Sequence, residues 1–183
     1  LEATRGKESE LSLAAINGPT STVISGTEDA VEEIRARFEE KGRKTKRLAV
    51  SHAFHSPLIE PMLEQLAAVA ESLDFNEPKL TVISNLTGEP LSPQQATDPA
   101  YWVAHAREPV RFADSVSTLK EQGATAYLEL GPDPVLLAIA RECLGEEGDI
   151  AAFLPTLREG REEQATVATA IAAAHAAGAE IQW

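Results

Sequence analysis

Cysteine is almost absent from this sequence, since Cys143 is the only one in 183 residues. A single cysteine cannot form an intramolecular disulfide, which excludes the disulfide framework typical of small secreted domains. A secretory signal pattern is also lacking, because residues 1–10 are polar and charged where an apolar segment would be needed. We therefore expect an intracellular, cytoplasmic protein.

Positive charge and long apolar runs are scarce as well. The 16 Lys and Arg residues against 29 Asp and Glu residues give a formal net charge of −13. Phosphate binding requires a basic surface, so a nucleic-acid partner is not expected. No apolar run approaches the roughly 20 residues of a membrane span, so we expect no membrane partner either. A hydrophobic content of 43% is nevertheless enough for the core of one domain or slightly more.

The hydrophobic pattern predicts an α/β (α+β) protein. The predicted strands cover residues 11–16, 22–26, 45–50, 80–84 and 124–130, with a strand-like segment at 179–183. The predicted helices cover residues 28–41, 59–73, 99–107, 110–122, 134–144 and 164–177. Residues 88–99 and 145–160 are predicted to be loops. Because strands alternate with helices, we expect parallel strand pairing.

The N-terminal part of this pattern has the order β-β-α-β over residues 11–51 and matches part of a ferredoxin-like domain. A complete domain of that kind needs a further β-α unit before Leu11. We therefore expect the front of that domain to be missing. Residues 1–10 show no periodicity and are predicted to be a flexible leader.

Two histidines bracket an aromatic side chain in the run His52-Ala53-Phe54-His55, which lies between a predicted strand and a predicted helix. A histidine at such a junction is held by rigid elements yet stays open to solvent, which suits a general base. A His-x-x-His pair can also bind metal, but no Cys, Asp or Glu cluster at ligand spacing completes a site. We expect no metal.

This run closely resembles the His-Ala-Phe-His signature of acyltransferase domains from modular polyketide synthases. The resemblance continues, in the family's order, through residues 14–19, 101–112 and 130–134. It implies the C-terminal portion of a domain similar to malonyl-CoA:acyl carrier protein transacylase. The implied parts are a partial ferredoxin-like subdomain (11–51), the C-terminal part of an α/β-hydrolase-like core (52–145) and a linker (146–183).

The resemblance also implies roles for individual residues. His55 would be the general base, and His52, Ala53 and Phe54 would select malonyl over methylmalonyl units. The backbone carbonyl at the position of His105 would orient the base. Pro109 fits this role, because it disfavours helical geometry at the preceding residue and leaves nearby carbonyls free to accept a bond.

The nucleophile of the family, a serine in a Gly-x-Ser-x-Gly elbow, is not found, since no serine here has glycine two positions before it. Ser56 is a poor substitute, because its side chain and that of the adjacent His55 point apart on any regular backbone. The resemblance also places the arginine for the malonyl carboxylate in the family's N-terminal half. We therefore expect this chain alone to be inactive.

By resemblance, the intact domain loads malonyl from malonyl-CoA onto serine and passes it to the phosphopantetheine of an acyl carrier protein. The ketosynthase of the same synthase is its implied neighbour, and no cofactor is permanently bound. The basic run at residues 43–47 either attracts coenzyme A phosphates or an acidic carrier protein, or is a solvated strand edge. Two alternatives are a truncated or engineered fragment that acts as a structural or docking module, and a stand-alone ferredoxin-like binding domain. The latter does not explain the histidine run.

Overall fold

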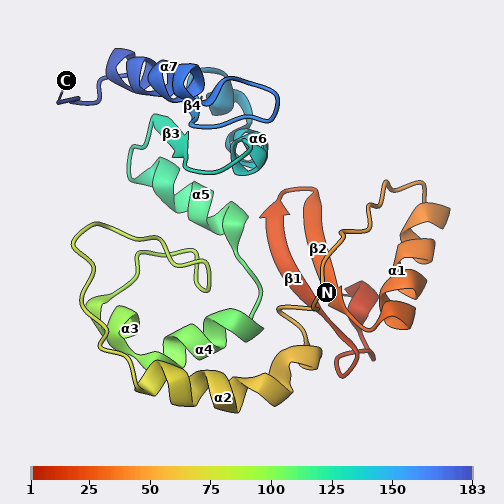
Figure 1. The fold of residues 1–183 in the computed structure, drawn as a ribbon. Coiled ribbons are helices and arrows are strands. Elements are labelled where there is room, and N and C mark those ends of the chain that lie inside the picture. The colour runs from red at the N-terminus through yellow and green to blue at the C-terminus, as the bar shows by residue number, and fades with distance from the viewer. Residues whose placement is uncertain (1, 183) are drawn as a thin grey trace. The chain divides into compact units, whose positions relative to one another are not determined.

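A computed structural model describes residues 2–182, which form two compact units; the first ends at Phe112 and the second begins at Ala113. The elements of the first unit are η1 (Glu2–Thr4), β1 (Leu11–Gly18), β2 (Ser21–Gly26), α1 (Glu28–Glu40), η2 (Pro57–Ile59), α2 (Glu60–Glu71), α3 (Pro93–Thr97) and α4 (Pro99–Arg107) (Figure 1). Those of the second are α5 (Phe112–Glu121), which starts at the boundary, β3 (Ala126–Glu129), α6 (Val135–Leu144), η3 (Gly145–Asp149), β4 (Ala152–Pro155) and α7 (Glu163–Ala176).

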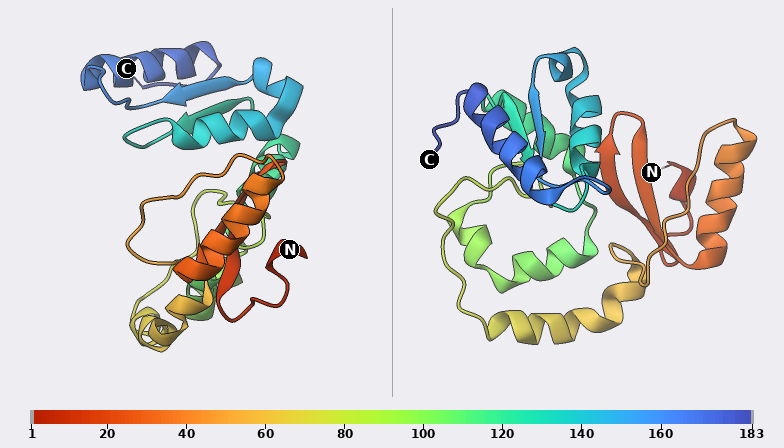
Figure 2. Two further views of the ribbon diagram at one scale, coloured as in Figure 1. Left: turned by 90° about the vertical axis from the view of Figure 1, so that its right-hand side faces the viewer. Right: turned by 45° about the horizontal axis from the view of Figure 1, so that its top comes forward.

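The first unit begins with an antiparallel hairpin of β1 and β2, against which α1 packs (Figures 1 and 2). Leu11 of the hairpin is buried against Ala30 and Ile34 of α1, with Ile24 at the edge of this cluster. Alternation along the strands and helical spacing along α1 turn these apolar side chains to one side. The other edge of β1 is occupied by Val110, whose N–H donates to the Ala14 carbonyl at 2.9 Å.

Helices α2 and α4 lie side by side in the same unit (Figure 2). The chain enters α2 through the short helix η2, which Ser56 caps. The Ser56 hydroxyl is fully buried, accepts a bond from the Leu58 N–H at 3.2 Å and donates one to the Ala53 carbonyl at 2.6 Å. The cap therefore connects the histidine run directly to the start of a helix.

The second unit contains a parallel pair of strands, β3 and β4, joined through α6 and η3. The Tyr127 and Phe153 rings stack at 5.5 Å across this pair. The parallel pairing confirms the expectation drawn from strand–helix alternation. However, β4 lies inside 145–160, which the sequence predicted to be a loop, because its four residues are too few to show a clear period.

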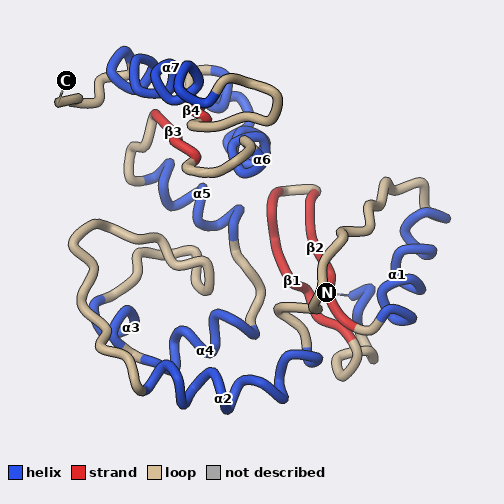
Figure 3. Tube along the Cα trace, viewed as in Figure 1, coloured by secondary structure: helices blue, strands red, loops and turns tan. Residues whose placement is uncertain are grey.

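Three predicted strands are wrong. Residues 45–50 are a loop and pair with no strand within residues 2–182, and Leu48 and Val50 are exposed (tan tube after α1 in Figure 3). Residues 80–84 form only an isolated bridge between Ile83 and Pro90. Residues 179–182 are not a strand either, and Trp183 lies outside the described residues. A strand requires a hydrogen-bonded neighbour, and a β-prone sequence does not supply one.

The predicted helices agree with the structure to within two residues at most ends, and the predicted loop at 88–99 contains the short α3. Their apolar spacing and start signals, such as Pro99 after Asp98, are local properties of the sequence. Within residues 2–182, no single helix is both long enough and apolar enough to cross a bilayer.

Candidate active site

His55 lies in the long loop between α1 and η2, with its side chain half-buried. Its Nδ1 lies 2.7 Å from the carbonyl oxygen of Glu108. A carbonyl oxygen can only accept, so Nδ1 carries the proton, and the Nε2 lone pair is left available to take another. This tautomer is the one that a general base at Nε2 requires.

The backbone of His55 has φ 59°, and it is the only residue other than glycine in the described chain with positive φ. This left-handed conformation costs roughly 1–3 kcal/mol for most side chains and persists where the surrounding structure determines it. Here the Ser56 cap follows immediately, and the Glu108 carbonyl holds the ring. Strain of this kind is concentrated at functional sites.

The orienting carbonyl belongs to Glu108 and not to His105, so that detail of the sequence prediction is wrong. Glu108 follows the last residue of α4 and is extended, with ψ 158°. Pro109 comes next and has no N–H, and Val110 is already paired with β1. The Glu108 carbonyl is thereby turned out of the helix toward His55. The signal that could have found it is its position directly before a proline.

His105 packs among aromatic rings within the same unit. Its imidazole stacks on Tyr101 at 6.3 Å and meets Trp102 edge to face at 6.4 Å. The Tyr101 hydroxyl is itself hydrogen-bonded to the buried Ser84 hydroxyl at 2.6 Å. Burial lowers the pKa of His105 from its ordinary value, and the nearby His55 lowers it further. His105 is therefore a neutral packed residue near His55.

This shift makes the stability of the first unit depend on pH. In the unfolded chain His105 takes a proton as the pH falls through about 6.5, whereas in the folded chain it resists until a lower pH. The unfolded state then binds more protons, so the contribution of His105 is complete above pH 6.5 and is lost below it. The urea midpoint of His105→Phe should fall less between pH 7.5 and 5.5 than that of the unmodified chain. His175→Gln, at an exposed histidine, should leave the slope unchanged; equal slopes for all three proteins would contradict the assignment.

The three residues before His55 form the surface of the same loop. The His52 ring meets the Phe54 ring edge to face at 6.1 Å, and its Nδ1 lies 2.9 Å from the Ser51 hydroxyl. Phe54 is 51% exposed, so its ring is available to a substrate. The structure thus brings His52, Ala53, Phe54 and His55 into one loop.

Ser56 is not a nucleophile in this arrangement, because its hydroxyl is fully buried and already donates and accepts a hydrogen bond. The site therefore contains an oriented histidine whose adjacent serine is not available to it as a nucleophile.

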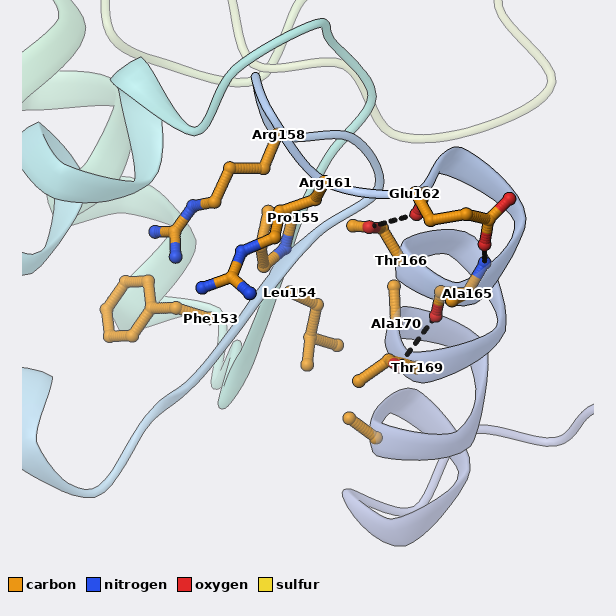
Figure 4. Close-up of a pocket in the computed structure, with 11 residues that line it drawn as sticks. Phe153, Leu154, Pro155, Arg158, Arg161, Glu162, Ala165, Thr166, Thr169 and Ala170 are labelled. Atoms are coloured by element: carbon orange, nitrogen blue, oxygen red, sulfur yellow. Dashed lines mark hydrogen bonds between the residues drawn. The ribbon is translucent and has the colours of Figure 1, made fainter.

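A separate groove of about 500 Å³ lies in the second unit between β4 and α7. Figure 4 shows the Arg158 and Arg161 side chains extending over it, with small side chains of α7 on the opposite wall. None of the residues predicted to take part in the chemistry lines this groove. We assign it no role in the site.

The fold and the site define a mixed α/β protein that carries a strained histidine, held by a backbone carbonyl at Nδ1 so that its Nε2 can accept a proton. The acyl transferase domain family matches residues 2–181. The chain belongs to this family. Its homologues include polyketide synthase GfsA of Streptomyces halstedii, which is 44% identical over 187 residues that cover 100% of this chain and 2% of that protein.

Solved structures agree with the family. The acyltransferase domain from the second module of the salinomycin polyketide synthase has a TM-score of 0.93 and 47% identity, covering 100% of this chain and 42% of that one. The malonyl-CoA:acyl carrier protein transacylase of Xanthomonas oryzae has a TM-score of 0.75 and 27% identity, covering 91% and 51%. The chain thus spans less than half of the solved polyketide synthase domain, and it is an acyltransferase-domain sequence of the polyketide synthase type.

Proposed function

We propose that this chain supplies the base and the acyl-selectivity loop of an acyltransferase that moves malonyl from malonyl-CoA to the phosphopantetheine of an acyl carrier protein. The observation that carries the proposal is the 2.7 Å bond between His55 Nδ1 and the Glu108 carbonyl. It fixes the tautomer in which Nε2 accepts a proton. The nucleophilic serine would come from sequence outside these 183 residues.

The reaction requires two proton transfers at His55 in each half. Nε2 takes the proton of the serine hydroxyl as its oxygen attacks the thioester carbonyl, and returns it to the sulfur of coenzyme A as the C–S bond breaks. In the second half Nε2 takes the proton of the phosphopantetheine thiol, which attacks the acyl-serine. The proton then goes to the serine oxygen as it leaves. The Glu108 carbonyl stabilises the imidazolium that exists between these transfers.

Several findings support malonyl and a carrier protein as the substrates. The His52-Ala53-Phe54-His55 run resembles the malonyl-selective form of the family's signature. A relative in this family is named as a malonyl-CoA:acyl carrier protein transacylase. A further solved structure of this kind holds an acyl carrier protein in complex with its malonyl-transacylase. We extend the proposal to a cytoplasmic setting beside a ketosynthase, as in a modular synthase.

Phe54→Ser in the intact domain tests the malonyl assignment. A ring beside the C2 position of the substrate leaves little room for a branching methyl, and one methyl group is worth only about 1–3 kcal/mol of discrimination. The variant should therefore raise methylmalonyl use relative to malonyl by a factor of roughly 10, with some loss of rate. Competition between the two thioesters, read by mass spectrometry of the loaded carrier protein, measures the ratio.

Phe38→Ser is the matched control, because Phe38 is also partly exposed but belongs to α1 and not to the histidine run. It should leave the ratio unchanged. If Phe54→Ser also leaves the ratio unchanged, Phe54 does not set the selectivity, and the malonyl assignment loses its structural basis.

A further inference from the structure

The position of the Glu108 carbonyl is set by a short stretch that has left the helix. The Glu108 N–H still donates to the Ala104 carbonyl at 2.8 Å, but beyond it the chain is extended and Pro109 donates nothing. On the far side, Val110 is held to β1 by its N–H and by its carbonyl, which accepts from the Ile16 N–H at 2.8 Å. The direction of the Glu108 carbonyl therefore depends on how the end of α4 is anchored.

Arg107, the last residue of α4, makes the side-chain contacts at this point. Its Nε lies 2.9 Å from Glu60 Oε1, and its Nη1 lies 3.3 Å from the Ser12 hydroxyl. The side chain is only 22% exposed, so this ion pair is less screened than the surface pairs of α1. A cation in the last turn is also favoured by the helix dipole.

The partners of Arg107 belong to the same chain segments that the His55–Glu108 hydrogen bond connects. Glu60 is the first residue of α2 and follows His55 through η2, whereas Arg107 immediately precedes Glu108. The Arg107–Glu60 pair and the His55–Glu108 bond therefore join the same two segments. Ser12 adds a third attachment, to β1.

We propose that Arg107 is a positioning residue, which anchors the end of α4 to α2 and β1 and so holds the Glu108 carbonyl against His55 Nδ1. The proposal rests on the function proposed above for His55. Lysine would not replace it fully, because a single ammonium group cannot reproduce the fork that reaches Glu60 and Ser12 together.

The tautomer of His55 in the 183-residue chain reports this positioning without any turnover. Nitrogen-15 NMR spectra at pH 8, where imidazole is neutral, should show His55 protonated at Nδ1, with the signal assigned by its loss in His55→Asn. In Arg107→Ala the signal should move toward a mixture of the two tautomers. Glu60→Gln, which keeps the shape of the side chain but removes its charge, should move it in the same direction.

Arg35→Ala is the matched control, since Arg35 forms ion pairs of 2.6 and 2.8 Å with Glu32 and Glu39 along α1 only. It should leave the tautomer of His55 unchanged. In the intact domain, Arg107→Ala should lower kcat roughly 10-fold with little change in KM, because small misplacements of a catalytic group cost this much or more. The kcat of Arg107→Lys should lie between the values for Arg107→Ala and for the unmodified domain.

The proposal is overturned if Arg107→Ala leaves both the His55 tautomer and kcat as Arg35→Ala does. It is also overturned if Arg107→Ala and Glu60→Gln shift the tautomer in opposite directions. Failure of the proposed function looks different: His55→Asn would then leave acylation intact while the tautomer still responds to Arg107→Ala.

Discussion

Replacing His55 with Asn in the intact acyltransferase domain should lower the rate of serine acylation by about 10²–10⁴-fold, the usual cost of losing a general base. Asparagine suits this test because it tolerates the left-handed conformation, with φ 59°, that His55 adopts. The loss should therefore reflect chemistry and not unfolding. Stopped-flow release of coenzyme A from malonyl-CoA measures the rate.

His52→Asn is the matched control, since His52 lies three residues earlier in the same loop. The hydrogen bond described for its ring joins Nδ1 to the hydroxyl of the neighbouring Ser51. It should change the rate several-fold at most, together with the choice of thioester. Equal losses from the two substitutions would show that His55 is not the base.

The 183-residue chain alone should form no acyl-enzyme with malonyl-CoA. Its histidine is oriented, but the sequence contains no Gly-x-Ser-x-Gly, and the adjacent Ser56 is buried and bonded. Intact-mass spectrometry after incubation should show the unmodified mass, whereas the complete domain should gain one malonyl group. A stoichiometric gain on the chain alone would contradict the expectation.

Cys143 is the one thiol that could give a misleading result in this experiment. Burial raises the pKa of its thiol, and the neighbouring Glu142 raises it further, so little thiolate is available to attack a thioester. Cys143→Ser should therefore also stay at its own unmodified mass. Loss of a label in this variant would identify a side reaction and not acyl transfer.

Local features of the fold were predictable from the sequence, whereas it was not predictable which β-prone segments find a strand partner. The helices at 28–40 and 99–107 follow from apolar spacing along them and from cap residues directly before them. The segments at 45–50 and 80–84 are equally β-prone, but a strand depends on a neighbour, and none pairs with 45–50 within residues 2–182. The short β4 was missed for the opposite reason, because it is paired although its pattern is weak.

In the site, too, features contiguous in the sequence were predictable and contacts between distant residues were not. The loop from His52 to His55 was predictable as a unit because it is contiguous in the sequence. The Glu108 carbonyl was placed three residues too early, at His105, because a backbone acceptor carries no side-chain signature. The anchoring by Arg107 was not predicted, since its partners Glu60 and Ser12 are distant in the sequence.

The pairing of the far end of the first unit with β1 has a consequence for synthesis on the ribosome. The His55–Glu108 bond closes a loop of 53 residues, and the Arg107–Ser12 bond joins residues 95 apart. Closing such loops costs entropy before the long-range contacts can repay it. Synthesis proceeds at about 5–20 residues per second, so residues 107–110 are made several seconds after the hairpin. His55 therefore acquires its orientation only after the hairpin and α1 have been made and have had time to fold.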